Sequence, residues 1–360
     1  MVGVDHVLAK LATVIDPDLK KDIVSMGMIK DLELNDGNLK FTLELTTPAC
    51  PFNDQIEQDV RNAVGDLEGI KSFDMNVTAK VMEGRSLDAD EAMATVKNII
   101  GVASGKGGVG KSTVSLNLAL ALAQSGAKVG LLDADIYGPS IPLMLGMQKA
   151  FLEVDNNKLQ PAESHGIKVV SFGFFAEQEH QAAIYRGPII SGILKQFLVD
   201  TSWSDLDYLI VDLPPGTGDI PLTLAQTIPI TGILVVTTPQ DVASNVAVKA
   251  IGMFNKLNVP LIGVVENMSY FVCPKCNDKH YIFGEGGAKR ISEKHNIPFI
   301  GEIPLNSGIM EGSDKGKPVI ITNPSSPSAE AIRSAAKNVA AQCSILAAKL
   351  KEEMQATTQA

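Results

Sequence analysis

A chain of 360 residues with 45% hydrophobic and 20% charged side chains can form one large globular domain or two domains of ordinary size. Its net charge of −10 at pH 7 disfavours a uniformly basic face, so nucleic acid is not an expected partner. No apolar stretch approaches the roughly 20 residues of a membrane helix, and the first thirty residues lack a signal-peptide pattern, so we expect a cytoplasmic protein that does not bind membranes.

The first part of the chain predicts a small α+β domain over residues 1–82. Apolar side chains at helical spacing, then alternating runs around an Asn-Asp-Gly-Asn turn, indicate its helices and strands. The predicted elements are, in chain order, a helix at 2–15, strands at 28–34 and 39–45, a helix at 54–64 and a strand at 73–81. Residues 83–95 are polar and charged, and we interpret them as a linker.

From residue 96 to residue 360 short apolar strands alternate with helical runs. Strands of this kind are buried on both faces, so the pattern predicts a doubly wound, mostly parallel α/β sheet. The predicted strands are 99–103, 129–132, 208–211, 233–237, 261–265 and 299–300. The predicted helices are 111–124, 245–257, 287–295 and a long amphipathic one at 328–354.

The sequence between the first strand and the first helix of this domain has the pattern G-x-x-x-x-G-K-[ST]. Its residues are Gly105, Lys106, Gly107, Gly108, Val109, Gly110, Lys111, Ser112 and Thr113. Glycines let successive backbone N–H groups wrap around phosphate oxygens at a helix N-terminus. We therefore expect ATP here, with Lys111 on the β- and γ-phosphates and Ser112 as a ligand of Mg²⁺.

The second lysine of the loop, Lys106, resembles the one that marks the MinD, ParA and nitrogenase-iron-protein class. In that class this lysine reaches the partner subunit's nucleotide, where a cation offsets charge on the transferred phosphoryl group. The resemblance implies a nucleotide-dependent homodimer in which Lys106 and Lys111 are catalytic.

Three carboxylates follow strand ends, where open α/β sheets bind ligands. Asp212 matches the aspartate that holds Mg²⁺ through water, Asp133 is a second contact for hydrated Mg²⁺, and Asp135 is the candidate for positioning the attacking water. Residues 214–218 form a turn-rich stretch that could respond to the γ-phosphate. Asn267 follows another strand, and the corresponding asparagine of the same class contacts adenine.

Cys273 and Cys276 form a C-x-x-C pair. Two thiolates supply half the ligands of a closed zinc site or of an iron–sulfur cluster, and His280 is a third ligand candidate with no fourth beside it. A symmetric dimer offers four cysteines and removes the shortage. Zinc binding and a redox pair stay as alternatives.

Two further cysteines are single. Cys50 directly precedes a predicted helix, whose N-terminus would lower the thiol pKa, and an inert buried cysteine is the alternative. Cys343 lies among Ala and Ile in the last predicted helix, and we interpret it as core.

Several of these segments together resemble the Mrp/ApbC family of P-loop iron–sulfur cluster carriers. They are K-G-G-V-G-K-S-T at 106–113, D-A-D-I-Y-G-P-S at 133–140, R-G-P at 186–188, D-L-P-P-G-T-G-D at 212–219 and N-M-S with C-P-K-C at 267–276. The T-T-P-A-C-P stretch at 46–51 resembles the assembly domain that precedes the ATPase in many members. Ile189, where the family pattern has Met, is a mild departure.

This resemblance implies a homodimer that bridges a [4Fe–4S] cluster through Cys273 and Cys276 and hydrolyses ATP slowly. It also implies apo iron–sulfur proteins and a cluster-assembly scaffold as partners. A competing hypothesis is a MinD- or ParA-like ATPase switch, although the stretch at 346–354 has equal numbers of acids and bases and so lacks the expected basic face. A nitrogenase-iron-protein-like ATPase is disfavoured because its cluster cysteines are widely separated.

Overall fold

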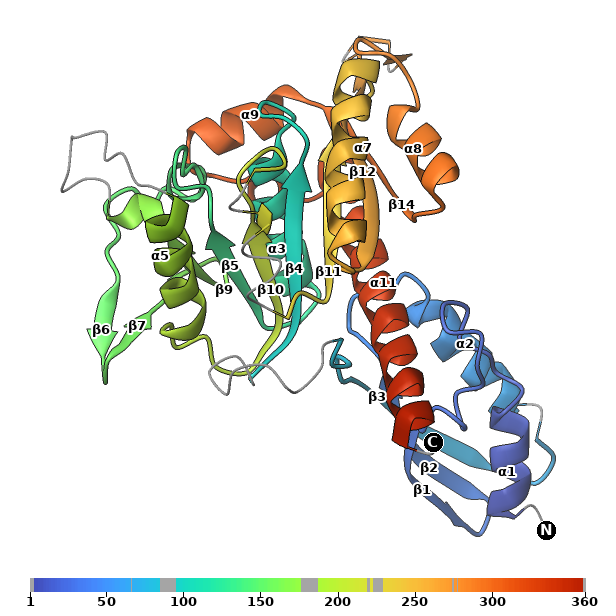
Figure 1. Ribbon diagram of the computed structural model, residues 1–360. Coiled ribbons are helices and arrows are strands. Elements are labelled where there is room, and N and C mark those ends of the chain that lie inside the picture. The colour runs from blue at the N-terminus through green and yellow to red at the C-terminus, as the bar shows by residue number, and fades with distance from the viewer. Residues whose placement is uncertain are drawn as a thin grey trace. The chain divides into compact units, whose positions relative to one another are not determined.

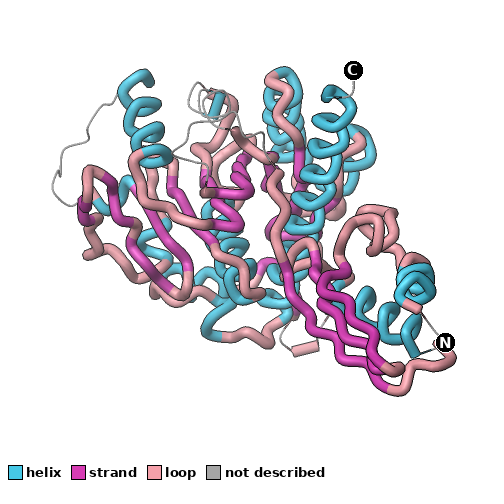
Figure 2. The backbone as a smooth tube through the Cα atoms, turned by 90° about the horizontal axis from the view of Figure 1, so that it is seen from below, coloured by secondary structure: helices cyan, strands magenta, loops and turns pink. Residues whose placement is uncertain are grey.

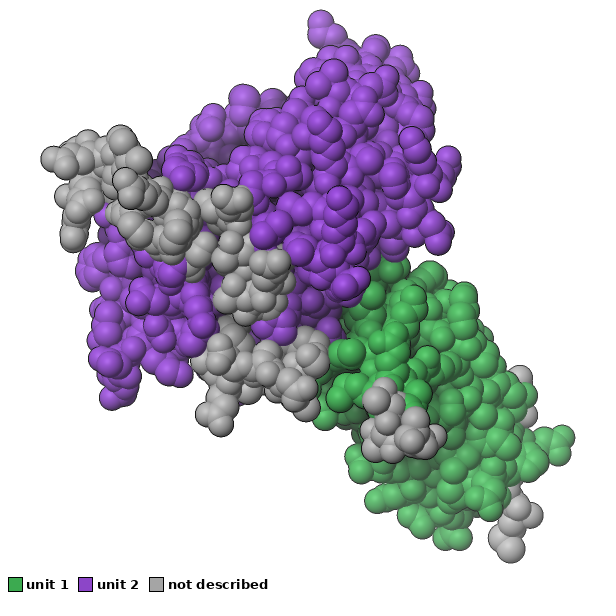
Figure 3. All heavy atoms as spheres, in the orientation of Figure 1, with its two compact units in different colours: residues 1–83, 340–360 green, residues 84–339 purple. Residues whose placement is uncertain are grey.

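The computed structural model describes residues 3–65, 67–84, 95–175, 187–218, 221–222, 229–273, 275–276 and 278–358. The chain forms two compact units, residues 1–83 with 340–360 (unit 1) and residues 84–339 (unit 2) (Figure 3). The sequence pattern predicts that the last 21 residues belong to the domain at 96–360. Instead, the second part of the terminal helix α11 (Pro327–Thr358) groups with unit 1.

Unit 1 has a three-stranded mixed sheet with the order β1-β2-β3, in which β1 and β2 are antiparallel and β2 and β3 parallel. Its elements are α1 (Val4–Leu11), β1 (Ile29–Asn35), β2 (Asn38–Leu45), α2 (Asn53–Gly65) and β3 (Ser72–Ala79). Alternate residues of β2 are buried against both helices, with Leu39, Phe41 and Leu43 at the centre of the core. The expected α+β architecture is confirmed.

The first helix is shorter than its apolar spacing predicts. It ends at Leu11, and Ile15 instead forms a β-bridge with Asp22. Ile15 is therefore exposed, although the helical pattern had assigned it to the buried face. The apolar spacing continues past the end of the helix, and the bridge to Asp22, which the spacing does not reveal, determines the conformation there.

Unit 2 contains a nine-stranded sheet with the order β13-β12-β11-β4-β10-β5-β9-β8, and β14 pairs with β12. Its strands are β4 (Val96–Ser104), β5 (Val129–Asp133), β8 (Ala162–Ser164), β9 (Ile167–Ser171), β10 (Leu206–Asp212), β11 (Gly232–Thr237), β12 (Leu261–Val272), β13 (Lys279–His280) and β14 (Phe299–Leu305). All pairs are parallel except β8 with β9 and β12 with β13. A short hairpin, β6 (Glu153–Asp155) with β7 (Lys158–Gln160), stands apart.

Helices cover both faces of this sheet. They are α3 (Lys111–Gln124), α4 (Ile141–Met144), η2 (Phe172–Phe174), α5 (Gly187–Val199), α7 (Asp241–Lys256), α8 (Gly287–His295), α9 (Ser307–Asp314) and α10 (Val319–Thr322). In Figure 1, α5 and α7 lie in front of the sheet and α3 behind it. Figure 2, seen from below, shows helices on both sides of the strands. The doubly wound, mostly parallel fold is confirmed.

The central strands are buried on both faces, which explains their uninterrupted apolar sequence. Every residue of β5, β10 and β11 is buried. After β4 the chain adds β5 on one side of this strand, and later it adds β11 on the other side. The direction in which strands are added to the sheet therefore reverses at β4. Ligands of open α/β sheets bind at such a reversal, beyond the strand carboxyl ends. In the part of the chain that the structure describes, no helix is long and apolar enough to cross a membrane.

Candidate functional site

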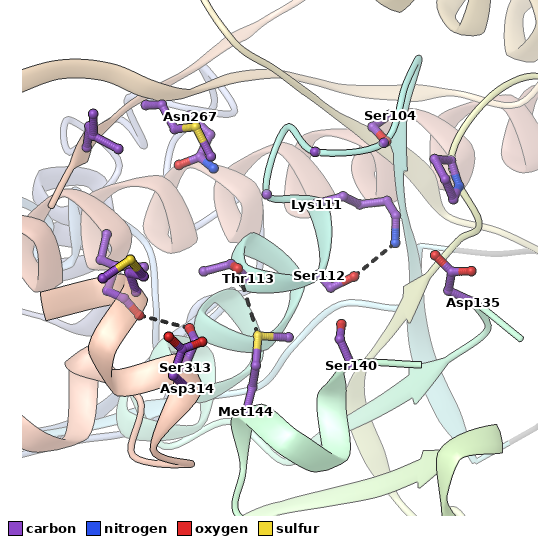
Figure 4. Close-up of a pocket in the computed structure, with 18 of the residues that line it drawn as sticks. Ser104, Lys111, Ser112, Thr113, Asp135, Ser140, Met144, Asn267, Ser313 and Asp314 are labelled. Carbon is purple, nitrogen blue, oxygen red and sulfur yellow. Dashed lines mark hydrogen bonds between the residues drawn. The ribbon is translucent and has the colours of Figure 1, made fainter. Parts of the chain in front are cut away.

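The loop between β4 and α3 forms one wall of a cavity of about 480 Å³ (Figure 4). Gly108 and Gly110 have φ angles of 82° and 81°, which only glycine adopts without strain. Gly107 and Gly108 are exposed, and nothing lies within 4 Å of a Cβ built on either residue. The loop therefore leaves open space above its backbone, at the N-terminus of α3, as phosphate binding requires.

Asp212, at the end of β10, is the buried centre of the site. Lys111 Nζ lies 2.8 Å from its carboxylate, and the hydroxyls of Ser112 and Ser115 donate to it at 2.5 and 2.6 Å. Lys111 is 6% exposed and Asp212 fully buried. Sequence reasoning missed Ser115, which lies one helical turn after Lys111 and so faces the same carboxylate.

Asp133 ends β5, beside Asp212 in the sheet register. It accepts hydrogen bonds from the Ser171 hydroxyl at 2.9 Å and from the backbone N–H of Asp135 and Ile141. Burial, followed by the neighbouring charge of Asp212, raises the pKa of Asp133 well above its usual range. Two buried carboxylates that disfavour each other's ionisation form a site suited to a divalent cation.

Asp135 also lines the cavity, facing the Lys111 side (Figure 4). Its pKa is raised mainly by burial, while the nearby Lys111 acts in the opposite direction. Lys106 is half-buried and lines the same cavity, and among the described residues it has no carboxylate partner within ion-pair distance. Both side chains thus border the space where a nucleotide would lie.

Asn267 is 6% exposed in β12 and its Nδ2 donates to the Val109 carbonyl oxygen at 2.8 Å. A Cβ on Gly110 would collide with that amide group. The side chain is therefore packed on the phosphate-binding loop, and it also borders the cavity. This position was expected to contact adenine, a role that stays a prediction.

The wall opposite the loop comes from β14 and α9, which the sequence did not single out. Apolar side chains dominate it, with two polar residues on α9, and they are Pro304, Leu305, Ile309, Met310, Ser313 and Asp314. Apolar walls with a few polar groups are typical of ligand pockets. No motif marks these residues, because a parallel sheet brings them to the loop from far along the chain. Pro215, in the predicted switch stretch at 214–218, completes the rim.

Cys273 and Cys276 lie directly after β12, one half-buried and the other exposed, and both are free thiols. Backbone N–H groups of Cys276 and Lys275 point at the Cys273 sulfur and lower the pKa of that thiol. His280, in β13, offers a third ligand atom, and the three ligand atoms lie within 4.8 Å of one another. The structure thus brings together the pair and the third candidate.

Cys50 is not the activated thiol that its place before α2 suggested. It is 5% exposed, and its Sγ donates to Asp18 Oδ2 at 3.1 Å. Burial raises the pKa of Cys50 to about 12, outweighing the Phe52 N–H that points at the sulfur. Cys343 is buried as expected, and burial likewise raises its pKa to about 12. Arg186 and Asp219, parts of two quoted motifs, lie outside the described residues.

Comparisons with known proteins agree with this geometry. A model of the NUBPL iron-transfer P-loop NTPase family matches residues 95–340, and a model of iron-sulfur cluster assembly proteins matches residues 5–79. The chain is 47% identical to an iron-sulfur cluster carrier protein of Synechocystis sp. over 352 residues, which cover 96% of this chain and 99% of the relative. It is 42% identical to an iron-sulfur cluster carrier protein of Escherichia coli (strain K12) over 337 residues, 93% of this chain and 91% of that one.

One solved structure is similar as well. It is a nucleotide-binding protein from Archaeoglobus fulgidus in complex with ADP, 41% identical, with a TM-score of 0.59 over 67% of this chain and 93% of that chain. The resemblance to the Mrp/ApbC carriers is thereby confirmed. This chain belongs to the family of NUBPL-type iron-transfer P-loop NTPases and also has an N-terminal domain of the iron–sulfur cluster assembly family.

Proposed function

We propose that this protein carries an iron–sulfur cluster on Cys273 and Cys276 and delivers it to apoproteins in a cycle driven by ATP. The observation that carries the proposal is the double role of β12. Asn267 of this strand holds the phosphate-binding loop through Val109, and Cys273 follows directly after the strand's last residue. One continuous strand therefore connects the nucleotide cavity to the thiols. The names of the Synechocystis and Escherichia coli relatives, similar over nearly their whole length, support the same function.

The cargo site needs a second copy of the chain. Cys273 and Cys276 give two thiolates, whereas a [4Fe–4S] cluster is held by about four. Because a two-fold axis brings the same patch together twice, a homodimer supplies the remaining pair. Both cysteines are accessible enough for this, since one is half-buried and the other exposed.

The nucleotide site fits ATP with Mg²⁺. Ser112, Asp133 and Asp212 offer the hard oxygen ligands that Mg²⁺ prefers, and the crowding of the two carboxylates favours a cation between them. Bound there, Mg²⁺ would neutralise charge on the phosphates. Lys111 leaves Asp212 to hold the β- and γ-phosphates.

Hydrolysis is assigned to two further side chains at the cavity rim. Asp135 positions the attacking water, because its carboxylate borders the cavity on the Lys111 side. Lys106, which has no carboxylate partner in the described residues, reaches the nucleotide of the second copy. A Lys106→Ala variant should therefore keep ATP affinity in the isolated chain and lose about a hundredfold or more in turnover.

The partners that follow are an assembly scaffold that loads the cluster and apo iron–sulfur proteins that receive it. The acidic charge of −10 gives no reason to expect nucleic acid or anionic membranes. We expect the protein to work in the cytoplasm, where thiols stay reduced.

Anaerobic reconstitution with iron and sulfide tests the cargo site. We expect about four iron atoms per two chains in the wild type and almost none in a Cys273→Ala/Cys276→Ala variant. Equal iron in both proteins would refute the assignment. A Cys343→Ala variant is the matched control, because it removes a buried thiol outside the pair.

A second arm tests the ATP cycle. A Lys111→Ala protein should still load cluster and should fail to transfer it to an apoprotein, because a nucleotide can shift the equilibrium only through contacts that differ between the two states. Unimpaired transfer by this variant would remove ATP from the mechanism. Lipid sedimentation and DNA binding complete the test, since either one would favour a switch of the MinD or ParA kind.

A further inference from the structure

The turn that presents the cysteine pair is a β-hairpin whose second strand also presents a histidine. β12 pairs with β13 in antiparallel register, with Phe271 opposite His280 and Val272 opposite Lys279. The Cys273 N–H extends the pairing by donating to the Asp278 carbonyl oxygen at 3.0 Å. The hairpin therefore holds both ends of the segment that contains the thiols.

Alternation along the two strands assigns the side chains to faces. On one face Tyr270 contacts Tyr281 edge-on at 6.4 Å between ring centroids, and Lys279 Nζ lies 4.1 Å from the centroid of the Tyr270 ring. Residues one position away point to the opposite face, which therefore carries Cys273 and His280. Because they are diagonal neighbours on one face, their side chains can meet.

The ligand atoms of Cys273, Cys276 and His280 do converge, all within 4.8 Å of one another. A tetrahedral ion bound by two thiolates and an imidazole separates these atoms by about 3.5–3.8 Å, so they would approach one another by at most about 1.3 Å. All three side chains are at least partly exposed, and such a surface hairpin can adjust by that amount. Among the described residues no fourth His, Cys, Asp or Glu joins the group.

We propose that each single chain binds one divalent transition-metal ion through Cys273, Cys276 and His280, with the fourth coordination position open to water. Two thiolates and an imidazole suit Zn²⁺, Co²⁺ and Fe²⁺, with Zn²⁺ bound more tightly than Fe²⁺. This site goes beyond the proposed cluster, which uses the cysteines of two chains and does not use His280. Because both sites need the same thiols, Zn²⁺ and cluster exclude each other.

Cobalt titration of the full-length, reduced, metal-free protein tests the site. Co²⁺ bound by thiolates gives sulfur-to-metal charge-transfer absorption, and its visible bands are intense only in tetrahedral geometry. We expect saturation at one Co²⁺ per chain, bleached by added Zn²⁺. His280→Ala should weaken Co²⁺ binding at least about tenfold and shift the visible bands, and the double cysteine variant should abolish the absorption. His6→Ala, which removes an exposed imidazole from α1 of unit 1, is the matched control and should titrate like the wild type.

Two results would overturn the inference. One is saturation at half a Co²⁺ per chain, which places the ion between copies. The other is a His280→Ala titration with wild-type affinity and spectrum, which leaves the imidazole outside the site. Iron and sulfide reconstitution of the same wild-type preparation separates the two proposals. Failure there removes the cluster proposal and leaves the Co²⁺ result intact, whereas loss of the Co²⁺ site leaves the cluster count unchanged.

Discussion

Asn267 offers a sharp test of how the nucleotide cavity is built. Its amide donates to the Val109 carbonyl oxygen at 2.8 Å, in a setting where the side chain is 6% exposed. Asn267→Ala removes the hydrogen bond and leaves a largely buried acceptor unpaired, which costs about 1–3 kcal/mol. The cost falls on the loop that binds phosphate, so we expect nucleotide affinity to fall by about 5–150-fold, at about 1.4 kcal/mol for each factor of ten.

Calorimetric titration with ADP and GDP separates the two possible roles of this side chain. If Asn267 only holds the loop, the affinities for both nucleotides fall in parallel and their ratio is unchanged. Asn267→Asp should lower nucleotide affinity more than Asn267→Ala does, because a carboxylate oxygen would then face the Val109 carbonyl oxygen. Asn255→Ala, on the exposed face of α7, is the matched control and should bind both nucleotides like the wild type.

The reasoning is refuted if Asn267→Ala loses affinity for ADP alone. The ratio of the two affinities would then collapse, and Asn267 would act on the base, as the comparison with the MinD and ParA class suggested from sequence. Both variants must melt well above the temperature of the titration, so that a loss of binding is not a loss of folding.

Three further predictions follow from packing and burial. Gly105→Ala should lower the melting temperature, because the added Cβ would lie 2.6 Å from a backbone oxygen of α7. Gly107→Ala should leave the melting temperature unchanged, because its Cβ would have open space around it. Equal melting temperatures for the two variants would contradict this prediction. At pH 8, Cys50 should be alkylated about a thousandfold more slowly than an ordinary thiol of pKa about 9, because its own pKa is about 12. Mass spectrometry of the modified peptides measures the rate, and a rate close to that of an ordinary thiol would contradict this prediction. Above pH 9 only the unfolded state loses the Cys343 proton, because burial raises the pKa of this thiol in the folded state to about 12. With rising pH, the unfolding free energy of the wild type should therefore fall by about 1.4 kcal/mol per pH unit more steeply than that of Cys343→Ala. Urea denaturation at pH 9–10.5 measures both free energies, and an identical pH dependence in the two proteins would refute the raised pKa.

Much of the nucleotide site was predictable because its chemistry is local in sequence. The glycines of the loop, Lys111 and Ser112 lie within one strand–turn–helix unit, and backbone conformation there needs those residue types. Asp133 and Asp212 were found for a related reason. The carboxyl ends of parallel strands meet at one edge of a sheet, so an acid after each strand must lie near the loop.

Other features were decided by contacts between segments far apart in the chain. The apolar wall at Leu305 and Ile309 carries no motif, and only the pairing of β14 with β12 brings it to the cavity. For Cys50 the local sequence was misleading, because its place before a helix suggested a lowered pKa. The desolvation that raises it depends on the surrounding core and on Asp18, which is distant in sequence.

The sequence by itself determined the fold class and the chemical groups of both sites, since strand and helix periodicity and short motifs are set by neighbouring residues. Tertiary structure alone decided three things: that α11 divides between two compact units, that Ser115 shares Asp212 with Lys111, and that His280 meets the cysteine pair. The physical reason is the same in each case. Burial and side-chain convergence are properties of strand register and packing, which join residues that the linear pattern keeps apart.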